Sequence, residues 1–325
     1  MTMLGMPPVP SRPEAGPPDG PIRFTDGHHF ALNADSELAG LVDQTVAPLS
    51  VILQVTKRCD FDCAFCSETL QMRDPSLPEL ETAATNLAGV QRVFLSGGEP
   101  LLRRDLLDVV DIFNSYVIGL PTNATRGMDL APKLAGKIAF ANIGFDGPRA
   151  IFQRVRGDYD KVLSGVFAFR EAGIPISFST VALRSVLHGL PSLLQIGDVL
   201  DVGKLKLILP LRKGNALDLP ESEFITVEEA TEHFHRLIDL RTTFDWAPAV
   251  RMTPWTPETE GHMIVVEPNG VTRAWPVYDE PDLWLPLGNV FQEPITEIWK
   301  RYPYKDNHVR KYLGASIMTV SRTAR

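Results

Sequence analysis

The sequence predicts an α/β fold: a partial (β/α)6 TIM-like barrel with a small C-terminal α+β appendage. Three observations lead to this prediction. Short β-rich runs alternate with amphipathic helices between residues 50 and 240, which is the pattern of parallel strands joined by βα units. The composition shifts toward proline and tryptophan after residue 240. The 325 residues, 44% of them hydrophobic, suffice for one large domain with a sizeable core and an appendage.

Six strands are expected, each a short run rich in β-branched and aliphatic residues. They lie at Ser50–Thr56, Arg92–Ser96, Tyr116–Leu120, Ile138–Gly144, Ile174–Val181 and Lys204–Leu209. Between them, Asp158 is expected to cap a helix that Gly173 ends. A second helix is expected from Asp105 to Phe113. In barrels of parallel strands, the loops at the carboxyl ends of the strands carry the active site.

Three regions are expected along the chain. Residues 1–45, rich in proline and glycine, form an N-terminal extension that we expect to be disordered. Residues 46–240 form the barrel. Residues 241–325 form the appendage, with a hairpin that turns at Asn269-Gly270 and a short helix from Ile295 to Arg301.

The overall charge and hydropathy exclude some functions. The net charge of −8 argues against nucleic acid or an anionic membrane surface as the main partner. No apolar run is long enough to cross a bilayer, and the N-terminus has no apolar segment like that of a signal peptide. A cytoplasmic location is therefore expected.

All three cysteines lie directly after the first expected strand, at Cys59, Cys63 and Cys66. Three clustered thiolates can bind a metal or an iron–sulfur cluster, but such sites normally have four ligands. The fourth ligand is then either a histidine from elsewhere or an open position where chemistry can occur. A disulfide framework needs an even number of cysteines. A Cys3His zinc site stays open, although the nearest histidines along the chain are distant, namely His28, His29 and His188.

The spacing C-x3-C-x2-C, with Phe65 before the last cysteine, resembles the radical S-adenosylmethionine (SAM) superfamily. So does the segment Ser96-Gly-Gly-Glu-Pro100, which follows about 30 residues later at the end of the second strand. The resemblance implies a [4Fe–4S] cluster on the three cysteines, with the unligated iron binding the amino and carboxylate groups of SAM. It also implies reductive cleavage of SAM to a 5′-deoxyadenosyl radical, which removes hydrogen from an unactivated carbon. A flavodoxin or ferredoxin is the expected electron donor.

Further segments resemble the SPASM and twitch branch of this superfamily. Pro121-Thr-Asn-Ala124 resembles its Thr-Asn-Gly turn, with alanine in place of glycine. Arg156 matches an arginine that meets the SAM carboxylate, a suitable partner for a guanidinium. Gly144 replaces a ribose-binding serine, so Ser177 or Ser179 is expected to bind the ribose instead. The SAM contacts expected in all are Phe65, Ser96, Gly97, Gly98, Glu99, Thr122, Asn123, Gly144, Arg156, Ser177 and Ser179.

The appendage resembles a SPASM or twitch domain without the cysteines that hold auxiliary clusters. We therefore expect a redox-neutral or reductively quenched reaction on a small molecule, such as a carbohydrate or nucleoside intermediate of natural product biosynthesis. Epimerisation, decarboxylation and dehydrogenation all stay open. Arg212 and Lys213, after the sixth strand, are candidate partners for a substrate carboxylate, and Asp146 is a turn-former, a substrate ligand or a base. Two alternatives remain: modification of a ribosomal peptide, such as epimerisation, and a non-catalytic Cys3His zinc-binding module.

Overall fold

The computed structural model describes residues 22–24, 30–32, 46–48, 50–68, 70–253, 264–274 and 286–302. Their main feature is one ten-stranded sheet with the order β12-β11-β10-β3-β4-β5-β6-β7-β8-β9. A separate antiparallel pair, β1 (Ile22–Phe24) with β2 (Phe30–Leu32), lies within the predicted N-terminal extension. The sequence analysis missed this pair. The rest of the predicted disordered extension lies outside the described residues.

Seven consecutive parallel strands form the barrel wall. They are β3 (Ser50–Thr56), β4 (Arg92–Gly97), β5 (Val117–Thr122), β6 (Phe140–Gly144), β7 (Ile176–Val181), β8 (Lys204–Ile208) and β9 (Ala249–Thr253). The first six confirm the predicted strands, with ends moved by at most two residues. β9 pairs in parallel with β8, although its residues lie in the region assigned to the appendage. The prediction missed it because this run lies after residue 240, where the shift in composition predicts the start of the appendage.

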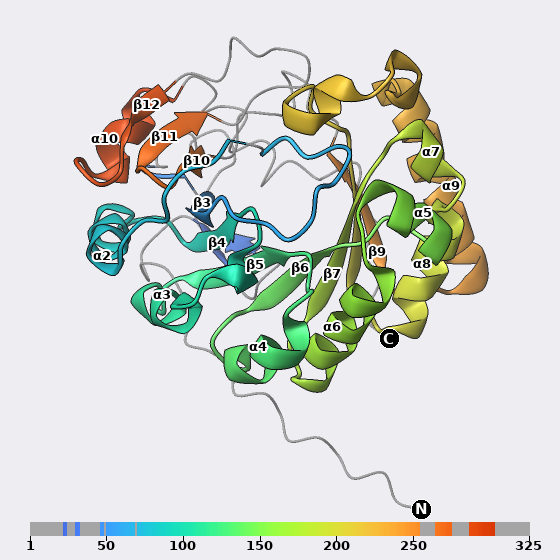
Figure 1. The fold of residues 1–325 in the computed structure, drawn as a ribbon, viewed down its shortest axis with the longest axis horizontal. Helices are drawn as coiled ribbons and strands as arrows, with labels where there is room; N and C mark the ends of the chain where they lie inside the picture. The colour runs from blue at the N-terminus through green and yellow to red at the C-terminus, as the bar shows by residue number, and fades with distance from the viewer. Residues whose placement is uncertain are drawn as a thin grey trace, which may run out of the picture.

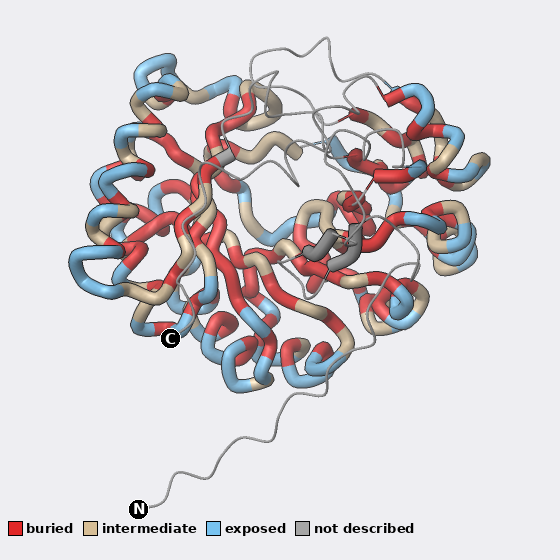
Figure 2. Tube along the Cα trace, turned by 180° about the vertical axis from the view of Figure 1, so that it is seen from behind, coloured by how far each residue is buried: buried red, intermediate tan, exposed pale blue. Residues whose placement is uncertain are grey.

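Helices cover one face of this curved sheet (Figure 1). They are α2 (Leu77–Asn86), α3 (Leu106–Ile112), α4 (Gly127–Leu134), α5 (Arg149–Val155), α6 (Tyr159–Glu171), α7 (Arg184–Leu187), α8 (Leu190–Val199) and α9 (Val227–Phe244). Alternate strand residues such as Val51, Leu53 and Val55 are buried in the core. Figure 2 shows this burial along the strands, with exposed surface on the outer turns of the helices. Asp158 caps α6 as predicted, accepting a hydrogen bond from the Lys161 N–H.

The predicted hairpin continues the same sheet. Its strands are β10 (Ile264–Val266) and β11 (Val271–Ala274), followed by β12 (Pro286–Asn289) and α10 (Ile295–Lys300). β10 pairs in parallel with β3, so these C-terminal strands extend the barrel sheet from its first strand. Gly270 has a φ of 82°, as the predicted turn requires.

Aromatic rings fill the sheet face away from the helices near the amino ends of the strands. Phe94 and Phe140 meet edge to face with ring centroids 5.9 Å apart. Gly119 lies between them, and a Cβ there would come within 2.7 Å of the Phe140 ring. The Arg92 guanidinium lies 4.8 Å from the Phe94 centroid, and its Nε donates to the Ser50 hydroxyl. Polar groups gather at the opposite, carboxyl end.

Helices α4 and α6 touch through two glycines, which gives a test of the packing. A Cβ on Gly165 would lie 2.0 Å from the Ala124 carbonyl oxygen, a backbone atom that cannot move aside. We expect Gly165→Ala to lower the free energy of unfolding by about 1–3 kcal/mol, measured by urea denaturation. Gly203→Ala is the control, because its Cβ would meet its nearest neighbour at 3.6 Å. Equal stability of the two variants would contradict this packing.

Candidate functional site

Most of the predicted site residues lie at the carboxyl ends of the strands or in the loops that follow them, whereas Ser177 and Ser179 lie within β7 and Arg156 directly follows α5. The cysteine loop, residues 57–68, leaves β3, and the segment Ser96–Glu99 ends β4. The turn at residues 122–125 follows β5, and Asp146 follows β6. Parallel strands bring these loops together at one end of the barrel.

The three cysteines have different surroundings: Cys59 is exposed, Cys66 is half-buried and Cys63 is buried. Two backbone N–H groups point at sulfur, with Phe61 N 3.5 Å from Cys59 Sγ and Glu68 N 3.4 Å from Cys66 Sγ. Hydrogen bonds of this kind stabilise cysteine thiolates around iron–sulfur clusters. The donors present therefore fit such a cluster.

Burial favours the protonated form of the Cys63 and Cys66 thiols. It raises the pKa of Cys63 to about 12 and also raises the pKa of Cys66. A metal must therefore displace protons to bind. Among the residues that the structure describes, no three His, Cys, Asp or Glu side chains converge as ligands of one ion.

The glycines of Ser96-Gly-Gly-Glu-Pro100 let two loops approach each other. Gly97 has a φ of 145°, and its Cβ would lie 1.9 Å from the Thr56 oxygen. A Cβ on Gly98 would lie 2.4 Å from the Arg58 oxygen. Backbone hydrogen bonds run from Gly98 N to Thr56 O and from Glu99 N to Arg58 O. Both glycines therefore hold the β4 segment against the start of the cysteine loop.

Glu99 is 1% exposed and joins this segment to the turn after β5. Its carboxylate accepts from the Thr122 hydroxyl at 2.7 Å and from the Asn123 backbone N–H at 2.5 Å. It also accepts from Leu101 N at 2.9 Å. Ala124, which replaces the expected glycine, has a φ of 62°. The turn thus keeps the left-handed conformation that favours glycine, despite the substitution.

The turn after β5 also holds the cysteine loop. Asn123 Nδ2 donates to Asp60 Oδ1 at 2.7 Å, and the Thr125 hydroxyl donates to Asp60 Oδ2 at 2.7 Å. Asn123 Nδ2 lies 4.0 Å from Cys59 Sγ. The polar groups of Thr122 and Asn123, expected at SAM, thus contact Glu99 and Asp60 in this structure.

Burial raises the pKa of Glu99 to about 7, even though three donors favour its charge. Because the pKa of Glu99 is higher in the folded state than its value near 4.5 in the unfolded chain, the protonated carboxyl group favours folding. This contribution to the free energy of unfolding is complete below pH 4.5 and is lost as the pH rises through 7. Between pH 4.5 and pH 8 we expect the free energy of unfolding of the wild type to fall by up to about 3 kcal/mol more than that of Glu99→Gln. Urea denaturation across this range measures the difference. Parallel pH profiles would contradict the raised pKa.

Arg156 and Asp146 form a buried ion pair beside Cys63. The Arg156 side chain is 12% exposed and that of Asp146 is fully buried. Asp146 also accepts from the Thr180 hydroxyl at 3.0 Å and from Val181 N at 2.9 Å. The Arg156 guanidinium carbon lies 4.9 Å from the Phe65 ring centroid. These contacts give Asp146 a structural role, as the anchor of Arg156.

A steric constraint explains why position 144 holds a glycine. A Cβ there would lie 2.5 Å from Arg156 Nη1, so any larger residue would displace the guanidinium. Ser177 and Ser179 face the same side of the sheet, and both hydroxyls donate to Asn142 Oδ1, at 3.0 and 2.9 Å. The sequence analysis missed Asn142. The available signal was its position, since it is a polar residue inside a β-rich run.

The two predicted anion partners after β8 point to different neighbours. Arg212 forms a two-point ion pair with Glu221 at 2.6 Å and lies 4.0 Å from the Phe224 centroid. Lys213 Nζ lies 3.1 Å from Glu68 Oε1. They do not converge on one binding position in this structure.

Glu68 is the centre of a polar cluster that the sequence analysis missed. Its carboxylate accepts from Lys57, Lys213 and Gln54 Nε2, the last at 3.0 Å. Burial opposes the charge of Glu68, but the two ammonium groups outweigh it and lower its pKa. Gln54 Oε1 is buried without a hydrogen-bond partner among the described residues. Gln54, a polar residue in the middle of the first strand, was the sequence signal that could have revealed this cluster.

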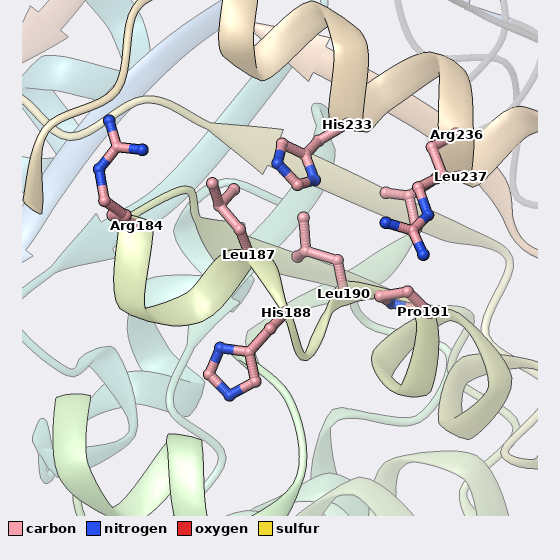
Figure 3. Close-up of a pocket in the computed structure, with 8 residues that line it drawn as sticks. All are labelled: Arg184, Leu187, His188, Leu190, Pro191, His233, Arg236 and Leu237. Carbon is pink, nitrogen blue, oxygen red and sulfur yellow. The ribbon is translucent and has the colours of Figure 1, made fainter.

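A separate cavity of about 320 Å³ lies between α7, α8 and α9 (Figure 3). Leucines form much of its lining, with His188 and His233 among the polar residues. None of the predicted site residues lines it. No described helix is long and apolar enough to cross a membrane.

Comparisons with known proteins agree with this arrangement. Residues 53–190 match the family described as the Radical SAM superfamily. The chain is 32% identical over 187 residues to the PqqA peptide cyclase of Rhodopseudomonas palustris, covering 52% of this chain and 49% of the relative. It is 33% identical over 180 residues to the GTP 3′,8-cyclase of Erythrobacter litoralis, covering 50% and 54%. The chain thus spans about half the length of these relatives.

Solved structures share the fold over a longer stretch. Streptococcus suis SuiB bound to S-adenosylmethionine superposes with a TM-score of 0.63 at 14% identity, covering 80% of this chain and 67% of that one. Native anSMEcpe with bound AdoMet gives 0.64 at 18% identity, covering 83% and 84%. Residues 53–190 therefore form a region similar to the Radical SAM superfamily, and the described barrel has the fold of solved structures that bind S-adenosylmethionine.

Proposed function

We propose that this protein binds a [4Fe–4S] cluster through Cys59, Cys63 and Cys66 and cleaves SAM reductively. The observation that carries the proposal is the cysteine loop, with N–H groups directed at two sulfurs, held at the carboxyl ends of parallel strands. When bound, the cluster and SAM would supply a 5′-deoxyadenosyl radical that removes a hydrogen atom from the substrate.

The chain's own residues would position these groups. Gly97, Gly98 and Glu99 hold the β4 segment at the cysteine loop, where the SAM ammonium is expected. Glu99 is a buried carboxyl group near this position, and a cation next to it would favour its ionised form. Arg156, next to Cys63, would offer its remaining N–H groups to the SAM carboxylate. Ser177 and Ser179 would line the ribose side.

The proposed substrate is a small molecule, a carbohydrate or nucleoside derivative. The polar cluster of Gln54, Lys57 and Glu68 supports this, because a hydroxyl group can accept a hydrogen bond from Lys57 and donate one to Gln54 Oε1, which has no partner among the described residues. A relative named for GTP supports it as well. A relative named for the PqqA peptide instead favours modification of a peptide, which we keep as the second candidate. A flavodoxin or ferredoxin would supply electrons in a reducing, cytoplasmic compartment.

Metal analysis tests the proposal. After anaerobic reconstitution with iron and sulfide, we expect about four irons and four sulfides per chain. Electron paramagnetic resonance of the reduced protein should then change when SAM is added. One zinc per chain without sulfide would instead support a zinc-binding module and overturn the proposal.

A further inference from the structure

The cysteine loop makes few backbone hydrogen bonds of its own. Within residues 59–66 the structure gives one, from Cys66 N to Cys63 O at 3.0 Å. Neighbouring elements must therefore set the relative positions of the cysteines. One support is Ala64 N, which donates to Val155 O at the end of α5 at 3.1 Å. Another is Asp60, held by the turn after β5.

A third support comes from residues 213–215, which follow β8 and which we call the clasp. Asn215 N donates to Cys66 O at 2.8 Å. Its side-chain Nδ2 donates to Cys63 O at 3.1 Å and to Asp62 Oδ1 at 2.6 Å. One residue therefore binds the carbonyl groups of two cysteines from a point about 150 residues along the chain.

The rest of the clasp fits closely against the same loop. Gly214 has a φ of 62°, and a Cβ there would lie 2.4 Å from the Cys66 oxygen. Lys213 Nζ lies 3.1 Å from Glu68 Oε1, just beyond the last cysteine. A glycine is required here, because both the backbone conformation and the close approach exclude a side chain.

The orientation of the Asn215 amide follows from its neighbours. Both contacts of Nδ2 are acceptors, a carbonyl and a carboxylate, and an amide nitrogen carries two N–H groups. The reversed amide would place its oxygen against two other oxygens. Both side-chain donors are therefore used on the cysteine loop.

We propose that Asn215 is a positioning residue that holds Cys63 and Cys66 in the arrangement needed for the cluster. The proposal rests on the proposed function of the cysteines. Cluster ligands depend on neighbouring hydrogen bonds for their orientation, and a loose ligand loop changes both cluster retention and electronic environment. The clasp also joins the loop after β8 to the ligand loop.

The test compares Asn215→Asp with Asn86→Asp. Asn215→Asp keeps the shape but replaces two donors by an oxygen that faces Cys63 O and Asp62. Asn86→Asp makes the same chemical change at an amide that donates to Val290 O at 2.8 Å, on the appendage side of the sheet. Asn215→Ala, which adds no charge, serves as a second variant should the aspartate impair folding.

Hydrogen–deuterium exchange of the metal-free protein gives the first readout. We expect the amides of residues 60–68 to exchange at least about tenfold faster in the Asn215 variants, since two side-chain hydrogen bonds are lost and each corresponds to about that factor. After reconstitution, the paramagnetic resonance signal of the reduced cluster with SAM should shift in the Asn215 variants and stay unchanged in Asn86→Asp.

The two proposals fail in different ways. Wild-type exchange and an unaltered signal in both Asn215 variants would overturn the positioning role. A wild-type protein that assembles no cluster would overturn the proposed function, while the exchange of the metal-free protein still reports on the clasp.

Discussion

Replacing Cys59, Cys63 and Cys66 together by alanine will abolish iron binding and SAM cleavage while the barrel stays folded. The three side chains belong to a loop outside the strands, and the largest buried side chains lie elsewhere, in the core. We expect the iron content to fall from about four per chain to none and 5′-deoxyadenosine to fall below detection. Circular dichroism should match that of the wild type.

A neighbouring substitution provides the control for this triple variant. Ser67→Ala changes the residue directly after Cys66 without removing a sulfur, and it should keep its iron. Cleavage of SAM by the triple variant would show that the cysteines do not hold the reacting cluster.

Asp146→Ala will cause a large loss of stability. It removes the counter-ion of Arg156, whose side chain is 12% exposed, and also leaves the Thr180 hydroxyl without its acceptor. An uncompensated buried charge costs about 3–5 kcal/mol. Urea denaturation of the metal-free protein should show a loss of this size.

A double-mutant cycle separates the ion pair from other effects. Arg156→Met removes the stranded charge, so the double variant should be more stable than Asp146→Ala alone. Asp160→Ala is the control, because its partner Arg149 lies on the surface and both side chains are more than half exposed. It should leave the urea midpoint unchanged. Additive losses in the cycle would contradict a coupled pair.

Sequence reasoning found the features that depend on local pattern. Six strands, the cap at Asp158 and the turn at Gly270 follow from residue periodicity and from the conformations that single residues favour. The cysteine spacing, with Gly97 and Gly98, indicated the resemblance to the radical SAM superfamily, whose family model matches residues 53–190. Motifs of this kind are contiguous in the sequence and can be read without knowing the fold.

The features that were missed depend on contacts between distant residues. Asn215 and Cys63 lie about 150 residues apart, and nothing in either segment indicates that they meet. Lys213 and Glu68 are likewise distant in the sequence. Their ion pair places Lys213, a predicted substrate contact, against the cysteine loop. The sequence alone showed that Gly144 departs from the serine of the family it resembles. Only the structure showed why, because the Arg156 guanidinium occupies the space that a side chain at position 144 would need.

The most direct test of the central claim is an assay for 5′-deoxyadenosine. The full chain is reconstituted anaerobically with iron and sulfide and then incubated with SAM and dithionite. We expect 5′-deoxyadenosine to form in the wild type and to be absent from the variant lacking Cys59, Cys63 and Cys66. A fully loaded [4Fe–4S] protein that binds SAM but yields no more 5′-deoxyadenosine than this variant would contradict the account.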